Sequence, residues 1–212
     1  TTGAQTGVYV GDIETEKNTN DEITGTKGND VIVGDEGGTS KKIVDGQNYN
    51  IAIIVDKSNS MKASSGTGSM NRMELLKASL NNLADTLANH DGVINLSIIG
   101  FGTNADTAIV FNNLTSSDLT ALKNSINGLN GYNSDWDSQV GGTNYEAAFN
   151  ATKAWFDGLS SSNDASYENM TYFLTDGEPT QYGTGQGIGN AYDSTADSKG
   201  QIAYNNLVNT HD

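Results

Sequence analysis

From residue 49 onward, short apolar runs alternate with longer stretches whose apolar residues recur every three or four positions. The run Ile51–Val55 is apolar throughout, which is typical of a strand covered on both faces. The stretch 71–89 has the spacing of a helix with one apolar face. Its apolar positions are Met73, Leu76, Leu80, Leu83 and Leu87. This alternation favours βαβ units and predicts an α/β fold, with a doubly wound, mostly parallel sheet and helices on both faces.

The remaining elements follow the same pattern. Asn71 and Glu74 have the spacing of a capping box at the start of the first helix. Further strands are predicted at 93–99, 107–111 and 170–174, and further helices at 116–129 (capped by Ser116), 144–156 and 201–208. A flexible glycine-rich loop is predicted at 183–200. Residues 1–48 are polar and rich in Gly and Asp, so we treat 1–48 as an N-terminal β segment and 49–212 as the main domain.

The charge balance excludes several classes of partner. The 212 residues include 11 Lys and Arg against 26 Asp and Glu, a formal net charge of −15. Such a chain is repelled by nucleic acid phosphates and by anionic lipid, so we expect no nucleic acid partner and no membrane insertion. We expect a monomer. Since there is no cysteine, stabilisation must come from a packed core or a bound cation.

Oxygen-bearing side chains gather at the predicted strand ends and at one helix start. Asp56, Ser58 and Ser60 follow the first strand, Thr143 opens a helix, and Asp176 follows the strand at 170–174. The carboxyl ends of parallel strands share one edge of a sheet, so these residues can converge. Hard divalent cations prefer oxygen ligands, and Mg²⁺ needs few carboxylates. The pattern predicts a cation site whose metal can take a further acidic oxygen from a partner protein.

Each of these residues also has a structural interpretation. Asp56, Ser58 and Ser60 could be ordinary loop residues, and Asp176 with Gly177 could form a plain turn. Thr143 has Glu146 three positions later, which is the spacing of a capping box. Capping and metal ligation are compatible for a hydroxyl.

The three motifs, in this order, resemble the metal-ion-dependent adhesion site of von Willebrand factor type A domains. The matching pieces are Asp56-x-Ser58-x-Ser60, Gly-Gly-Thr143, and Phe-Leu-Thr-Asp176-Gly. The resemblance covers about 49–210 and implies a Rossmann-like fold, a bound Mg²⁺, Ca²⁺ or Mn²⁺, and adhesion through that ion. It also implies direct coordination by Ser58 and Ser60, direct or water-mediated contact by Thr143 and Asp176, and contact through water by Asp56. Such domains usually continue with further strands, so we expect this chain to lack the last ones.

The N-terminal segment resembles the glycine–aspartate repeat of RTX proteins. The pattern is Gly25-Thr-Lys-Gly-Asn-Asp30, followed by Gly34-Asp35-Glu-Gly-Gly. This resemblance implies a possible second site, for Ca²⁺, at Asp30 and Asp35. It also implies a large bacterial adhesin, exported by type I secretion and located outside the cell, on the bacterial surface.

Three further residues are candidates for the rim of the metal site. Glu178 lies two positions after Asp176, and Tyr132 and Trp136 lie in the loop before Thr143. Aromatic residues are enriched at binding hot spots. A solvated role for Glu178 and core packing for the two aromatics are the alternatives.

Two functions remain open and a third is not expected. The first is a secreted adhesion module whose divalent cation captures an acidic group on a host or neighbouring-cell protein. The second is a calcium-stabilised spacer with no ligand of its own. Catalysis is not expected, because the sequence has only two histidines and no nucleophile elbow.

Overall fold

The computed structural model describes residues 43–66, 68–130 and 141–211. The proposed calcium residues Asp30 and Asp35 and the rim candidates Tyr132 and Trp136 lie outside the described residues. Nearly all of the N-terminal segment lies outside them as well.

A four-stranded sheet forms the centre of the domain, in the order β3-β2-β1-β4. The strands are β1 (Asn48–Asp56), β2 (Ile94–Phe101), β3 (Ile109–Phe111) and β4 (Tyr167–Leu174). β1 pairs in parallel with both β2 and β4, and only the short β3 runs antiparallel, to β2. The predicted mostly parallel sheet is confirmed.

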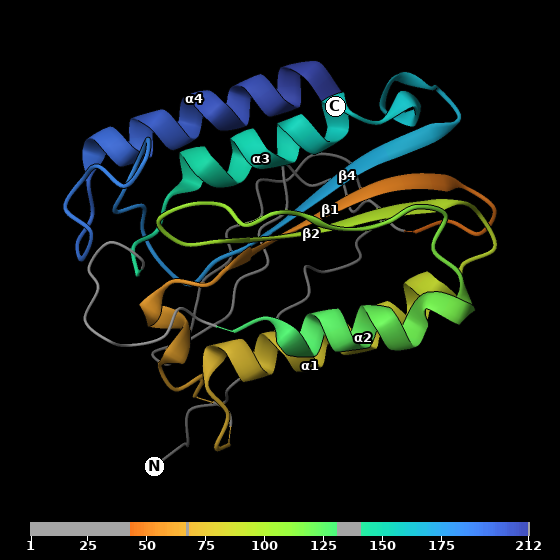
Figure 1. Ribbon diagram of the computed structural model, residues 1–212, viewed down its shortest axis with the longest axis horizontal. Helices are drawn as coiled ribbons and strands as arrows, with labels where there is room; N and C mark the ends of the chain where they lie inside the picture. Colours follow the sequence, from red (N-terminus) through yellow and green to blue (C-terminus); the bar gives the residue numbers. More distant parts are fainter. Residues whose placement is uncertain (1–42, 67, 131–140, 212) are drawn as a thin grey trace, which may run out of the picture.

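Two helices cover each face of the sheet (Figure 1). One layer contains α1 (Arg72–Ala88) and α2 (Leu119–Gly128), and the other contains α3 (Tyr145–Asp157) and α4 (Ser194–His211). Short 3-10 turns occupy Asn59–Lys62, Ser116–Asp118 and Ser160–Asn163. The predicted arrangement of helices on both faces is therefore confirmed.

The continuous apolar run in β1 serves both helix layers. Ile51, Ile53 and Val55 pack in the cluster that includes α1 and α2. Ala52 and Ile54 point the other way, into the cluster formed with α3 and α4. Because successive strand residues face opposite sides, the middle of a strand between two helix layers is apolar at successive positions, as the run Ile51–Val55 shows.

Helix capping agrees with the sequence at α1 and differs at α2. Asn71 accepts a hydrogen bond from the Glu74 backbone, and the Glu74 side chain returns one to Asn71, so this capping box is confirmed. The predicted cap Ser116 is wrong by one residue. Thr115 forms a box with Asp118 at the 3-10 turn that precedes α2.

The prediction of a flexible loop over 183–200 is wrong from residue 194 onward, because α4 already begins at Ser194. Asp193 Oδ1 accepts hydrogen bonds from the backbone N–H groups of Thr195 and Ala196, which satisfies the helix start. The sequence predicts a loop at Gly200, but this residue lies buried within α4, against Tyr145 of α3. A glycine allows the two helices to approach closely.

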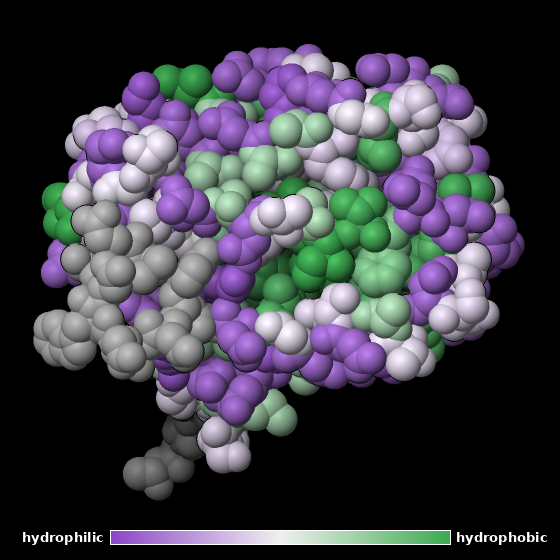
Figure 2. Space-filling model, viewed as in Figure 1, coloured by the Kyte–Doolittle hydropathy of each residue, from purple (hydrophilic) through white to green (hydrophobic). Residues whose placement is uncertain are grey.

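The surface shows the same layering. Figure 2 shows apolar side chains between the two helix layers, over the edge of the sheet, and mainly polar ones around them. Among the described residues, no helix combines the length and the apolar character required to cross a membrane.

We predict that Gly200→Ala destabilises the domain. A Cβ at this position would lie 2.8 Å from the Cβ of Tyr145, and overpacking costs about 1–3 kcal/mol. This cost exceeds the gain of about 0.5–1 kcal/mol that alanine brings to a helix. The measurement is the free energy of unfolding in urea.

Gly128→Ala is the matched control, because a Cβ on Gly128, at the end of α2, would meet no atom within 4 Å. This variant should be neutral or slightly stabilised. Equal stability changes in the two variants would contradict close packing at Gly200.

Candidate metal centre

The sheet brings two of the predicted acidic residues to one edge. Asp56 is the last residue of β1. Val55 is paired with Leu174, the last residue of β4, so Asp176 follows at the same end of the sheet. Strand pairing alone therefore brings together two loops that are more than a hundred residues apart in sequence.

Hydrogen bonds link four of the five predicted site residues. The Asp56 carboxylate accepts from the Ser58 backbone N–H at 2.7 Å. The hydroxyls of Ser58 and Ser60 lie 2.8 Å apart, and the Ser60 hydroxyl donates to Asp176 Oδ1 at 2.7 Å. Asp56 and Ser58 are buried, whereas Ser60 is exposed. The result is a row of oxygen atoms that leads from a buried acid toward the surface.

Thr175 completes this row and was not predicted. Its hydroxyl donates to the second oxygen of Asp56 at 2.7 Å. The hydroxyl of Tyr145, on α3, lies 3.3 Å from Thr175 Oγ1 and donates to the Gly177 carbonyl. Burial raises the pKa of Tyr145 to about 12, so the phenol remains a neutral donor. Tyr145 thus holds the turn that carries Asp176.

Burial dominates the electrostatics of Asp56. Removal from water raises the pKa of this carboxyl, because the charged form loses hydration. Hydrogen bonds from Ser58 and Thr175 oppose the rise, and the nearby charge of Asp176 adds to it. The ionised acid is therefore unfavourable here unless a positive charge lies close by.

Arg72 supplies a positive charge to Asp176 and not to Asp56. Its guanidinium donates to Asp176 Oδ2 at 2.5 Å from the first residue of α1. A cation at a helix start opposes the helix dipole, so the contact with Asp176 accounts for its position better than helix stability does. Arg72 is the only arginine in the sequence. A single arginine in the chain could have drawn attention to this residue, but nothing in the sequence indicated that it pairs with Asp176.

The turn that carries Thr143 lies against the loop after β1. The Asn59 backbone N–H donates to the Gly141 carbonyl at 3.3 Å. A Cβ on Gly141 would lie 2.1 Å from the Asn59 amide nitrogen, so a larger residue there would have to displace the Asn59 side chain. Thr143 itself is buried and bonds through its backbone to Thr180. Within the described parts of the chain its hydroxyl has no hydrogen bond, which leaves it free to act as a ligand.

The capping interpretation of Thr143 is wrong. Asn144 caps α3, and its side chain accepts from the Ala147 backbone N–H. The Glu146 carboxylate instead accepts from the backbone of Gly183. Glu178, the described rim candidate, is exposed in the turn after Asp176.

The donor set fits a hard divalent cation. All donors are carboxylate or hydroxyl oxygens, which are the ligands that Mg²⁺ and Ca²⁺ prefer. The oxygen separations of 2.7 and 2.8 Å along the serine row are close to the spacing of about 3 Å between neighbouring ligands of an octahedral Mg²⁺. An ion here would supply the positive charge that buried Asp56 lacks. Ser58, Ser60 and Asp176 are the residues whose side-chain oxygens would hold it.

Comparison with known families gives the chain its classification. Residues 51–178 match the von Willebrand factor type A domain. The chain belongs to this family. The match contains most of β1, the loop after it, the Gly-Gly-Thr turn and the end of β4, so it includes every motif of the candidate site.

Several solved structures are similar in fold. The pilus adhesin SpaC from Lactobacillus rhamnosus GG, in its open conformation, is 17% identical with a TM-score of 0.49, over 76% of this chain and 23% of that one. The pilus adhesin RrgA from Streptococcus pneumoniae is 15% identical with a TM-score of 0.48, over 64% and 21%. The von Willebrand domain of the type V pili tip protein Mfa5 from Porphyromonas gingivalis is 12% identical with a TM-score of 0.47, over 66% and 41%. The chain therefore spans less than half the length of each. No curated protein matched the chain.

We predict that Asp56→Asn stabilises the domain when metal is removed. A raised pKa means that folding favours the protonated acid, so ionised Asp56 costs stability as the pH rises through its folded pKa. Asparagine removes the charge and keeps an acceptor for the Ser58 N–H. The melting temperature in EDTA should therefore rise at neutral pH, and the gain should vanish as the pH falls below 3.8.

Asp164→Asn is the control, because the pKa of Asp164 is shifted in the opposite direction to that of Asp56. Hydrogen bonds from Ser166 lower the pKa of exposed Asp164, so its charge is favourable and its loss should bring no gain. A lower melting temperature of Asp56→Asn than of the unchanged protein, in EDTA at neutral pH, would contradict the electrostatic argument.

Proposed function

We propose that this domain is an adhesion module in which a divalent cation captures an acidic group of a partner protein. The proposed ligands are Asp56, Ser58, Ser60, Thr143 and Asp176, arranged as a metal-ion-dependent adhesion site for Mg²⁺, Ca²⁺ or Mn²⁺. The observation that carries the proposal is the hydrogen-bonded convergence of Asp56, the two serines and Asp176 at one end of the sheet.

The charges around the site favour an anionic ligand. Two carboxylates balance the two positive charges of the ion, and the hydroxyls add none. Arg72 then contributes one further positive charge beside Asp176. With an ion bound, the centre formed by Asp56, Asp176 and Arg72 would carry one net positive charge within a chain of net charge −15, with exposed Glu178 at its rim. Since the rest of the surface repels acidic proteins, binding of an acidic group would depend on the ion.

The proposed location is the surface of a bacterial cell. The glycine–aspartate pattern near Asp30 and Asp35 supports a calcium-binding RTX-type adhesin that leaves the cell by type I secretion. Labelling of intact cells with an antibody against the domain tests this location. Labelling that appears only after the cells are lysed would show that the protein is inside the cell, and would refute the proposed surface location.

We also propose that the domain is not an enzyme. Its two histidines lie away from the candidate centre, one in the turn after α1 and the other at the end of α4, where His211 bonds to Asp157. No imidazole is therefore placed to act as a base beside the ion. An esterase and phosphatase screen with Mg²⁺ should show no turnover that Asp56→Asn removes.

Metal binding is the first stage of the functional test. The double variant Ser58→Ala/Ser60→Ala should bind Mn²⁺ at least tenfold more weakly than the unchanged protein, measured by electron paramagnetic resonance. Ser79→Ala/Ser125→Ala is the matched control, because the hydroxyls of exposed Ser79 and half-buried Ser125 bond only to the preceding turn of their own helices. Equal Mn²⁺ affinity in both double variants would refute the site.

Adhesion is the second stage. The domain is applied to a panel of immobilised host surface proteins with Mg²⁺ or with EDTA. We expect binding to at least one protein, lost in EDTA and in Thr143→Ala, whose backbone bonds to Thr180 remain available. If Mg²⁺ raises the melting temperature but no protein is retained, the domain is a cation-stabilised spacer instead.

A further inference from the structure

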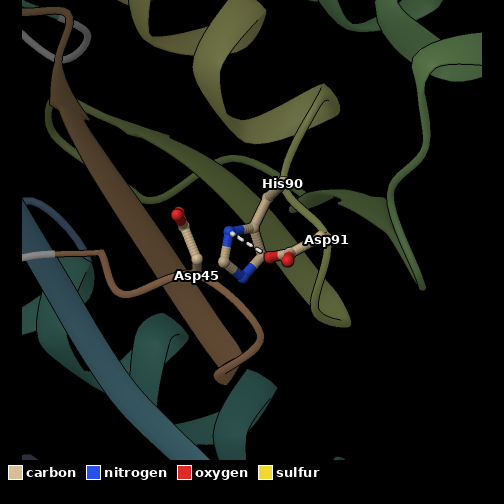
Figure 3. A group of neighbouring side chains, drawn as sticks. All are labelled: Asp45, His90 and Asp91. Carbon is tan, nitrogen blue, oxygen red and sulfur yellow. Dashed lines mark ion pairs between the residues drawn. The ribbon is translucent and has the colours of Figure 1, made fainter.

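A second group of metal-ligating side chains lies at the opposite end of the sheet. Asp45 belongs to the turn before β1, and His90 and Asp91 belong to the turn between α1 and β2. The parallel pairing of Tyr49 with Ile94 brings these two turns together at the amino ends of their strands. Figure 3 shows the imidazole between the two aspartates. This group is separate from Asp56, which ends β1 at the other edge.

The His90 ring is held in one orientation. Its side chain is only 3% exposed, and it packs against Tyr49 with ring centres 5.6 Å apart. Nε2 lies 2.7 Å from the Gln47 carbonyl oxygen. Because a carbonyl only accepts, Nε2 must carry a hydrogen, and the lone pair of a neutral ring is therefore on Nδ1. Metal-binding histidines are commonly oriented by such a bond to a backbone carbonyl.

Nδ1 faces negative charge without a hydrogen bond. Asp91 Oδ1 lies 3.9 Å from Nδ1, beyond hydrogen-bond distance, and among the described residues no other hydrogen bond to this nitrogen is present. One ligand atom from each of Asp45, His90 and Asp91 lies within 4.8 Å of the other two. A divalent cation among them could take the Nδ1 lone pair and one oxygen from each carboxylate as ligands.

The two turns are already joined around this group. The Gly46 N–H donates to Asp91 Oδ1 at 2.5 Å, with Gly46 in a left-handed conformation (φ 76°) that suits glycine. The Val44 N–H donates to the Tyr49 hydroxyl at 2.8 Å. These bonds fix the backbone that carries Asp45 and Asp91, so little ordering is needed before a ligand binds.

The geometry points to a binding site for a divalent transition metal such as Zn²⁺ at Asp45, His90 and Asp91, with water in the remaining positions. One imidazole nitrogen and two carboxylates suit Zn²⁺ better than Mg²⁺ or Ca²⁺, which prefer oxygen alone. The group formed by Asp56, Ser58, Ser60 and Asp176 (the Asp56 group) offers only oxygen ligands. It would therefore prefer Mg²⁺ or Ca²⁺ to Zn²⁺.

A metal at this position would tie the start of β1 to the turn before β2. Asp45 lies on one side of that junction, and His90 and Asp91 lie on the other. An ion that binds only when both turns are in place stabilises the folded domain. The site would therefore stiffen the point where the chain enters the sheet, far from the proposed adhesion surface.

The test follows the His90 ring by ¹⁵N NMR during titration with Zn²⁺ at mildly alkaline pH, where imidazoles are generally neutral. The chain has only two histidines, so the spectrum is simple. We expect a large shift of the Nδ1 resonance of His90 and none for His211. Asp45→Asn and Asp91→Asn should each weaken Zn²⁺ binding at His90 at least tenfold, and both residues are exposed enough for the fold to survive.

Asp85→Asn is the matched control. It removes one negative charge from the same end of α1, where exposed Asp85 forms an ion pair with Lys123. Its Zn²⁺ affinity should stay within threefold of the unchanged protein. An unmoved His90 resonance at millimolar Zn²⁺, or equal weakening in all three variants, would overturn the site. Neither result bears on the proposed adhesion function, because His90 does not report on the Asp56 group.

Discussion

Strand β1 pairs in parallel with β2 on one side and with β4 on the other, and this pairing decides where the polar loops meet. Parallel strands end together, so a loop after β1 and a turn after β4 have to share one edge. Both faces of β1 are covered by helices, which leaves its two ends as the places where polar side chains can gather. The Asp56 group occupies one end, and the Asp45–His90–Asp91 group occupies the other.

The buried acid at the end of β1 is costly in the isolated domain. Asp56 is fully buried, and its hydrogen bonds from Ser58 and Thr175 do not cancel the loss of hydration. A fold optimised for stability alone would carry a neutral residue there. The position is better understood if a cation completes it, because an ion reverses the sign of the electrostatic term. Arg72 neutralises Asp176 and not Asp56, so it leaves the buried acid uncompensated.

The sequence was most informative where local pattern and tertiary role coincide. The apolar run of β1 and the capping box at Asn71 predicted what the structure contains, and the order of the three motifs predicted the family. Contacts between distant segments were not predictable. Thr175 and Arg72 act on the site through residues more than a hundred positions away. The early start of α4 was missed because Gly200 disfavours a helix locally, whereas its close contact with Tyr145 requires a small residue there.

Tyr145 connects these observations. Its ring packs against Gly200 of α4, and its hydroxyl donates to the Gly177 carbonyl in the turn that carries Asp176. A larger residue at 200 would push on the tyrosine and hence on that turn. Gly200, which made the secondary structure hard to predict, therefore also affects the candidate metal centre through Tyr145. Packing between α3 and α4 determines the position of an acidic oxygen at the edge of the sheet, so the stability of this helix layer and the geometry of the site depend on the same contact.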